Sequence, residues 1–179
     1  MVGEPIEDLE ERACRGEAAA FGHLIRVFDG DLRATVWSVV RSSEVTDDVM
    51  QVAYERAFRS IRTFKRESSL KTWLHSICYR AAIDHVRYES RRRHERIEDA
   101  LAFSAGVGVD DAVIARMELV EALGRLDPSQ RAVVMLTAGL GYSFDEAAAI
   151  TGLRRGTVAS KAARARRRLE RVNRGGEIR

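Results

Sequence analysis

The sequence predicts an all-α protein with two small helical domains joined by a flexible linker, the second domain being a helix-turn-helix. Apolar residues recur every three or four positions along almost the whole chain, and no segment alternates as a strand does. The 179 residues contain only two prolines to interrupt helices. Periodicity fades over residues 94–112, where glycine, serine and aspartate gather, and this composition is typical of a connector. We therefore expect domains over residues 1–93 and 113–179, with a linker over 94–112.

Four helices are expected in the first domain. Short helices over residues 18–28 and 32–41 are separated by Asp29-Gly30-Asp31, and a third helix follows a cap region at residues 46–48. The apolar stripe of the third helix consists of Met50, Ala53, Tyr54, Ala57, Phe58 and Ile61. The stripe of the fourth consists of Leu70, Trp73, Leu74, Ile77 and Ala81, with Lys71, His75, Arg80 and Arg87 around the rest. The fourth helix runs into the basic cluster at residues 91–93.

The second domain carries strong helix boundary signals. Asp127 is a cap residue before Pro128, which suits the first position of a helix. Ser143 and Glu146 have the spacing of a capping box, and Gly152 is suited to the turn between two short helices. The last helix begins at about residue 155, and its Val158 is placed to pack on the preceding helix. This arrangement predicts a DNA-reading helix-turn-helix.

Basic residues dominate the last helix. Between residues 154 and 174 the only acidic residue is Glu170, whereas the basic ones are Arg154, Arg155, Lys161, Arg164, Arg166, Arg167, Arg168, Arg171 and Arg174. Such a row is the electrostatic footprint of phosphate contact. Taken alone, an arginine run is equally compatible with a solvated helix face. The capped helix and glycine turn in front of it favour DNA binding.

Composition and charge limit the kinds of protein that this sequence can encode. The formal net charge is +3, because an acidic N-terminal arm offsets the basic segments. No apolar run approaches the roughly 20 residues that span a bilayer, so we expect no membrane insertion and a cytoplasmic location. Cys14, Cys78 and the four histidines lack metal-ligand spacing, and we expect neither a metal nor a cofactor. Both thiols are interpreted as small apolar residues, with a redox role as the alternative.

Several motifs resemble the extracytoplasmic-function (ECF) sigma factors of bacterial RNA polymerase. In the first domain they are TDDVMQVAYERAF at 46–58, SLKTWLHSI at 69–77 and AIDHVR at 82–87. In the second they are LGRLDPSQR at 123–131, EAA at 146–148, GTVASK at 156–161 and RAR at 164–166. The resemblance covers almost the whole chain, in the family's order. It implies a specificity subunit that binds core RNA polymerase and promoter DNA, with no catalytic residues of its own.

The resemblance assigns roles in the first domain. The polar face of Asp48, Gln51 and Glu55 would dock on the clamp of the β′ subunit. The loop over residues 62–69 corresponds to the loop that receives a flipped base when the minus-ten element opens. The candidate minus-ten contacts are Phe64, Lys65, Arg66, Lys71, Trp73, Arg80 and Arg87. The two aromatic residues are also compatible with a purely structural role in the core.

The resemblance also assigns roles in the second domain. The candidate minus-thirty-five contacts are Arg154, Arg155, Thr157, Ser160, Lys161 and Arg164, early in a helix that would enter the major groove. The β flap and an anti-sigma factor are further implied partners. Two departures bear on base preference: Arg80 stands where the family often has asparagine, and Arg154 and Arg155 stand where a capping serine often precedes Gly-Thr-Val.

Other functions are compatible with parts of the pattern. A stand-alone DNA-binding regulator would bind its operator tightly without polymerase, but this chain has two dissimilar basic regions. A decoy that only sequesters another protein would not need the basic recognition helix. An enzyme is the weakest alternative, since no metal, phosphate-loop or triad spacing is present.

Overall fold

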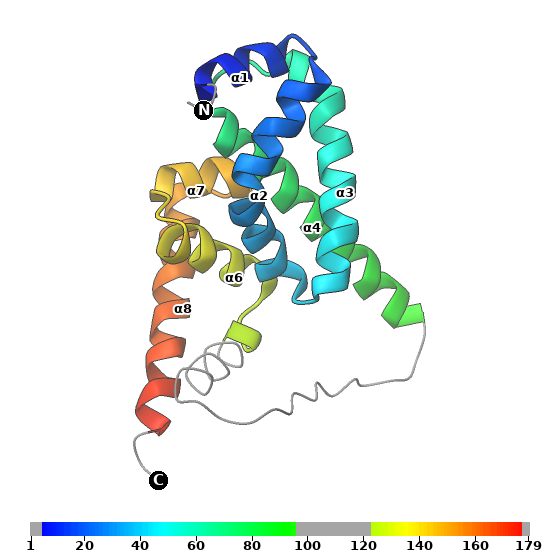
Figure 1. Ribbon diagram of the computed structural model, residues 1–179. Coiled ribbons are helices and arrows are strands. Elements are labelled where there is room, and N and C mark those ends of the chain that lie inside the picture. The colour runs from blue at the N-terminus through cyan, green and yellow to red at the C-terminus, as the bar shows by residue number, and fades with distance from the viewer. Residues whose placement is uncertain (1–4, 96–122, 177–179) are drawn as a thin grey trace, which may run out of the picture.

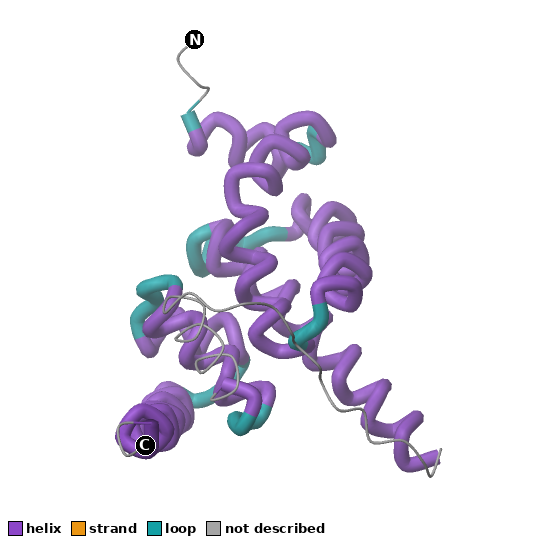
Figure 2. The backbone as a smooth tube through the Cα atoms, turned by 60° about the horizontal axis from the view of Figure 1, so that its bottom comes forward, coloured by secondary structure: helices purple, strands orange, loops and turns teal. Residues whose placement is uncertain are grey.

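The computed structural model describes residues 5–95 and 123–176, and in this part every regular element is helical (Figure 2). Domain one contains α1 (Ile6–Cys14), α2 (Ala18–Val40), α3 (Ser43–Ser60), a 3₁₀ turn η1 (Ile61–Thr63) and α4 (Leu70–Glu95). Domain two contains α6 (Pro128–Val134), a π-helical turn η2 (Met135–Gly139), α7 (Phe144–Thr151) and α8 (Arg155–Gly176). The expected linker lies outside the described residues, except that α4 continues through 94 and 95.

Helix α2 is the central element of domain one. It packs against α1, α3 and α4, as Figure 1 shows. Its apolar residues Leu24, Leu32 and Val36 are fully buried, together with Met50 of α3 and Leu74 of α4. Burying side chains of this size stabilises the fold by about 1.5–3 kcal/mol each. The amphipathic stripes of three helices thus meet in one core.

The predicted break within α2 is wrong, because residues 18–40 form one helix. Gly30 in a helix interior costs only about 1 kcal/mol, and the buried stripe continues past it through Leu32. Both flanking acids are held by partners elsewhere. Asp29 accepts hydrogen bonds from Tyr54 Oη (2.6 Å) and Arg33 Nε (2.8 Å), and Asp31 pairs with Lys71.

Two details of α3 differ from the predictions. The helix begins at Ser43, and its cap is Ser42, whose Oγ accepts from the backbone amide of Val45 (3.3 Å). Thr46 instead lies inside the helix and is buried. Phe58 is 40% exposed rather than part of the core, although its ring stacks on Phe21 with centroids 5.3 Å apart. Tilted aromatic pairs with centroids about 4.5–7 Å apart are favourable, by about 0.5–1.5 kcal/mol beyond the burial of their surface.

The helix start and stop signals predicted at Asp127, Ser143 and Gly152 are confirmed. Asp127 caps α6 with Pro128 at its start, and Ser143 and Glu146 form a capping box at the start of α7. Gly152 ends α7 in the left-handed conformation, with φ 70°, which glycine adopts without steric cost. Val158 of α8 is fully buried. The helix-turn-helix is therefore built by local signals in the sequence.

The two domains pack directly against each other. α6 contacts α2, and α7 contacts α4 (Figure 1). Buried apolar residues of both domains belong to a single core. The packing explains why α4 is buried on two faces. His75, expected outside the apolar stripe of α4, is fully buried, with Tyr142 of domain two against its ring.

Candidate nucleic-acid interface

Three of the predicted minus-ten residues share one face of α4. Trp73, Arg80 and Arg87 are seven positions apart, and seven residues complete almost two turns of an α-helix. Arg80 and Arg87 are exposed. The guanidinium of Arg80 is positioned by Ser76, since its Nε donates to the carbonyl oxygen (3.2 Å) and its Nη2 to Oγ (2.9 Å). This face of α4 therefore carries two exposed cations, and Ser76 fixes the orientation of one of them, Arg80.

The loop before α4 combines an aromatic anchor with exposed cations. The rings of Phe64 and Trp73 lie 5.2 Å apart, and both pack against the core. Lys65 and Arg66 are exposed, and Arg66 has a φ of 57°, an uncommon conformation for a residue with a side chain. The structure therefore gives the two aromatic residues a packing role. Their stacking on a base stays a prediction, as does strand contact by the two cations.

A pocket of about 350 Å³ lies between this loop and α1. Phe64, Arg66 and Ser69 line it on the loop side, and Glu10 and Cys14 line it on the α1 side. Burial and the nearby Glu7 raise the pKa of Glu10, and burial raises the pKa of Cys14. The acidic N-terminal segment thus forms one wall of the pocket beside the loop.

Lys71 lies on the opposite side of α4 from Trp73. Its Nζ is 2.5 Å from Asp31 Oδ2 and 5.9 Å from the ring centroids of Phe28 and Tyr142. The structure does not bring Lys71 together with Arg80 and Arg87. It instead pairs this lysine with α2 near the domain interface, and a contact with the DNA strand stays a prediction.

The proposed docking face of α3 is exposed. Asp48, Gln51 and Glu55 follow one another at helical spacing, and all three side chains are open to solvent. Glu55 has a weak ion pair with Arg59 at 3.6 Å. In Figure 1, α3 lies at the right of the molecule and domain two at the left. The structure brings these residues together as one polar face.

The residues predicted to contact DNA at the start of α8 differ in their exposure to solvent. Arg154, Arg155, Ser160 and Arg164 are exposed, and Thr157 is half-buried. Arg155 Nε lies 3.1 Å from Asp145 of α7, which partly offsets the cost of a cation at a helix N-terminus. Lys161 is turned aside: its side chain is 22% exposed, and its Nζ lies 3.7 Å from Asp127. Arg154, Ser160 and Arg164 are the residues best presented for contact.

Sequence reasoning missed a set of buried polar residues between the domains. Arg131 of α6 is only 9% exposed, and its Nε and Nη2 donate to the carbonyl oxygens of Ser38 (2.7 Å) and Val39 (2.8 Å) in α2. Its Nη1 donates to the carbonyl oxygen of Leu126. A helix leaves its last four carbonyls unpaired, so Arg131 caps α2 from the other domain. The sequence signal that could have indicated this role is the position of Arg131 within an apolar helix stripe.

His75 and Tyr142 meet at the same interface. Their rings are nearly perpendicular, with centroids 5.1 Å apart, and His75 Nδ1 lies 2.9 Å from Thr35 Oγ1. His75 Nε2 and Tyr142 Oη are buried without a hydrogen-bond partner. Burial lowers the pKa of His75 to about 4 and raises that of Tyr142. The imidazole is therefore neutral at physiological pH.

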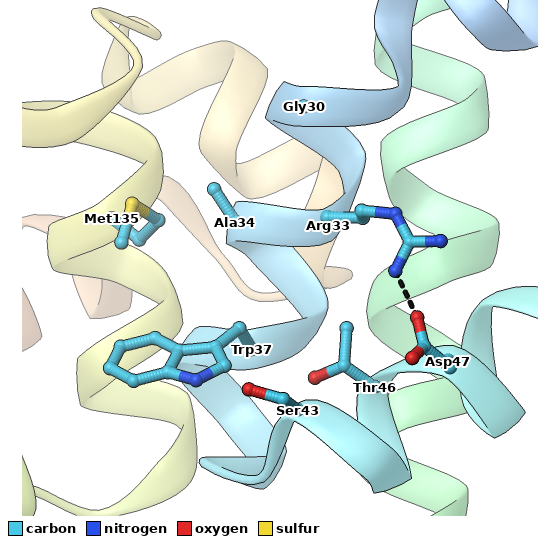
Figure 3. A pocket seen from close by; sticks show the side chains of 8 residues that line it. All are labelled: Gly30, Arg33, Ala34, Trp37, Ser43, Thr46, Asp47 and Met135. Atoms are coloured by element: carbon cyan, nitrogen blue, oxygen red, sulfur yellow. Dashed lines mark hydrogen bonds and ion pairs between the residues drawn. The ribbon is translucent and has the colours of Figure 1, made fainter.

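A groove opens beside this interface (Figure 3). Its volume is about 460 Å³, and Met135 of η2 faces Ala34 and Trp37 of α2 across it. The dashed line in Figure 3 marks the ion pair between Arg33 and Asp47, which closes one side of the groove. Domain two therefore does not fill the whole surface that domain one offers.

The described residues offer neither a metal site nor a membrane-spanning helix. Among residues 5–95 and 123–176, no cluster of histidine, cysteine, aspartate or glutamate has the arrangement of a metal site. No helix in the same part of the chain has the length and apolar character needed to cross a membrane. The described polar clusters are thus the basic faces, the α3 face and the domain interface.

Comparisons with known proteins agree with this division. Residues 24–92 match the family model for Sigma-70 region 2, and residues 116–169 match that for Sigma-70 region 4. The chain is 33% identical over 157 residues to the ECF RNA polymerase sigma factor SigM of Mycobacterium tuberculosis, covering 88% of this chain and 79% of SigM. It is 31% identical over 170 residues to the RNA polymerase sigma factor NccH of Alcaligenes xylosoxydans, covering 91% of each.

Two solved structures are similar over most of the chain. One is CnrH in complex with the cytosolic domain of CnrY, with a TM-score of 0.70 and 26% identity, covering 93% of this chain and 96% of that one. The other is the sigma factor RpoE of Bartonella quintana in complex with the anti-sigma factor NepR, with a TM-score of 0.70 and 27% identity. That match covers 86% of this chain and 96% of RpoE.

Proposed function

Because the chain belongs to the ECF family of RNA polymerase sigma factors, we propose a division of promoter recognition between its two domains. Domain one docks on core polymerase and opens the minus-ten element, and domain two reads the minus-thirty-five element. The observation that carries this proposal is the presence of two separate exposed basic helix faces, one on α4 and one on α8. A single-site DNA-binding regulator would need only one of them.

Docking on core polymerase is assigned to α3. Asp48, Gln51 and Glu55 form an exposed polar face on a helix that is separate from the basic face of α4. Negative charge on a docking face favours a basic partner surface and disfavours DNA. The separation allows the domain to hold polymerase and DNA at the same time.

Strand opening is assigned to the loop over residues 62–69 and to α4. Unpaired DNA is held by cations along the backbone and by a pocket or aromatic surface for a displaced base. Arg80 and Arg87 supply the cations. The pocket between Phe64, Arg66 and α1 is the candidate receptor for the base.

Reading of duplex DNA is assigned to α8. Arginine pairs with two acceptors on guanine in the major groove, and each such pair contributes about 1–3 kcal/mol of discrimination. Arg154 and Arg164 are both exposed. The later arginines of α8 are assigned to phosphate contact, which adds affinity without sequence preference.

The setting and control of the protein follow from the same assignment. Promoter DNA and polymerase place its action in the cytoplasm. RpoE of Bartonella quintana was solved with an anti-sigma factor, and we propose that a partner of this class also binds this chain.

Transcription in vitro tests the function. The purified protein is added to bacterial core RNA polymerase and genomic DNA fragments, and RNA start sites are mapped. We expect new start sites that share a two-part upstream motif. Tight DNA binding by the protein alone, with no new transcripts, would contradict the proposal and favour a stand-alone regulator.

Three variants test the residue assignments. Glu55→Lys should lose binding to core polymerase and keep binding of minus-thirty-five duplex DNA, whereas Arg164→Ala should show the reverse. Arg26→Ala, an exposed arginine on α2 outside all of these surfaces, is the control and should change neither. A loss of both activities in either test variant would show that the two functions are not divided as proposed.

A further inference from the structure

An ion pair joins the two helices of the helix-turn-helix at the start of α8. Arg155 Nε lies 3.1 Å from Asp145 Oδ1 of α7. Lys161 has a comparable pair with Asp127, but its side chain is only 22% exposed. The Arg155 side chain is 64% exposed, so the pair with Asp145 restrains the guanidinium without covering it. Arg155 is therefore held by a neighbour and still open to a ligand.

The local structure fixes the backbone on both sides of this pair. Asp145 lies in the first turn of α7, where Ser143 and Glu146 form the capping box. Arg155 is the first residue of α8, and Val158, one turn further along, is fully buried. α7 and α8 also pack against each other (Figure 1). Because both partners lie on packed helices, the backbone keeps the two side chains within reach of each other.

The ion pair leaves part of the guanidinium free for a base. A guanidinium has five N–H donors, and a carboxylate on the Nε side occupies at most two of them. The two hydrogens at the end of the fork, on Nη1 and Nη2, stay available. They match O6 and N7 of guanine, the acceptors with which arginine forms a bidentate pair in the major groove. Arg155 can therefore contact Asp145 and a guanine at the same time.

The position of Asp145 is unfavourable for DNA binding by itself. Duplex DNA is a dense row of phosphates, which repel an acid beside the recognition helix. The Asp145 side chain is 75% exposed, so burial does not shield this charge. Restraining Arg155 offsets the repulsion, because immobilising a long side chain on binding lowers the affinity by about two- to tenfold. A guanidinium that is already held loses less of this freedom when it meets the base.

We propose, on the basis of the proposed function, that Asp145 is a positioning residue through which Arg155 reads a guanine of the minus-thirty-five element. Asp145 does not contact the base. It holds the Nε side of Arg155, so that the end of the fork meets O6 and N7. The pair lowers the affinity for duplex DNA in general and raises discrimination for guanine. The later arginines of α8, which contact phosphate in the proposed function, supply no such discrimination.

Two substitutions test the two roles. Arg155→Met removes the fork and keeps the apolar stem, whereas Asp145→Asn removes the negative charge and keeps the size of the side chain. The matched control is Glu44→Gln, which removes an exposed acid from the first turn of α3 in the other domain. Circular dichroism and urea unfolding check that all three variants are folded.

Selection from a pool of duplex DNA with randomised sequence measures base preference. The full-length proteins are tested with and without core polymerase, and the bound duplexes are sequenced. At one position the wild type should prefer guanine by about 5- to 150-fold, the discrimination of one bidentate pair. Both test variants should lose most of this preference, and Glu44→Gln should keep it. Retention by Arg155→Met overturns the reading role, and retention by Asp145→Asn overturns the positioning role.

A duplex of fixed, unrelated sequence distinguishes positioning from a purely structural role. Asp145→Asn should bind this duplex about twofold more tightly, because a charge that phosphate repels is gone. If Asp145 served only to stabilise α7, the variant would bind every duplex more weakly, and that result would overturn the proposal. In the Arg155→Met background, Asp145→Asn should not change base preference further. A further change would show that Asp145 acts on the base by another route.

Failure of the proposed function gives a different result from failure of this inference. If the wild type directs new transcription start sites, but both test variants keep the guanine preference, the inference is overturned and the proposed function stands. If the wild type directs none, the proposed function fails. A guanine preference of the protein alone that depends on Asp145 and Arg155 would still support the pair, and the absence of any preference would overturn it.

Discussion

The ion pair between Lys71 and Asp31 offers a test of whether this lysine serves the fold or the DNA. The Nζ–Oδ2 distance is 2.5 Å, and the two side chains are 35% and 42% exposed. Pairs at this exposure contribute about 0.2–1 kcal/mol. The nearby rings of Phe28 and Tyr142 exclude some water, so we expect a coupling free energy in the upper half of this range.

A double-mutant cycle measures this coupling. Wild type, Lys71→Met, Asp31→Asn and the double variant are unfolded in urea, and the coupling is the part of the free-energy change that is not additive. We expect about 0.5–1 kcal/mol at low salt and less at high salt. A coupling below about 0.2 kcal/mol would refute the structural reasoning.

The competing role for Lys71 has its own measurement. A lysine that neutralises one phosphate of single-stranded DNA contributes about 0.7 to the slope of log affinity against log salt concentration. From the structure we expect Lys71→Met to leave this slope unchanged and Arg87→Met to reduce it. A reduced slope in Lys71→Met would show that the ion pair with Asp31 opens in the DNA complex.

Three further predictions concern stability and reactivity. Gly152→Ala should destabilise the protein by about 1–2 kcal/mol in urea unfolding, because a Cβ there meets no neighbour and only the left-handed backbone is penalised. Ser143→Ala should cost about 1 kcal/mol and raise the pKa of Glu146 in an NMR titration, since hydrogen bonds from Ser143 hold that pKa below its ordinary value. The lowered pKa gives stability that is present above the unfolded-state pKa and lost as the pH falls through the folded-state pKa, so the variant should lose less stability on acidification. Cys78 is 2% exposed and burial raises its pKa to about 12, so mass spectrometry should show iodoacetamide modifying it only after unfolding. Cys14 is partly exposed and should react in the folded protein, but slowly, because burial raises its pKa too.

In domain two, sequence signals that act over one helical turn were read correctly, whereas the cap of α3 was predicted four residues too late. The Ser143–Glu146 box and the Asp127–Pro128 start depend on residues within three positions of each other, and the structure has both. The seven-residue spacing of Trp73, Arg80 and Arg87 also puts them on one face of α4, although the sequence prediction placed Trp73 on the apolar stripe and the two arginines off it. Helix periodicity alone determines such faces, whatever packs on the rest of the molecule.

Long-range contacts explain the other errors. Asp29-Gly30-Asp31 has the composition of a break, but Tyr54 and Lys71 bind the two acids from other helices, and neither partner is marked in the local sequence. His75 was placed outside the apolar stripe of α4, because nothing near it in the sequence indicates that domain two covers this part of the helix. The cross-domain role of Arg131 was missed for the same reason. A hydrogen bond between segments about ninety residues apart in the sequence can be identified only once the fold is known.

The shared core has a consequence for cooperativity. Apolar residues of domain two pack against α2 and α4 of domain one in a single core. With the domains packed in this way, the protein should unfold on heating in one calorimetric transition. Domain two is near the size at which a domain is marginal by itself. If it leaves domain one, it loses the support of α2 and α4, and its melting should separate from that of the larger bundle. Binding to polymerase or DNA would then have to supply the stability that intramolecular packing no longer provides.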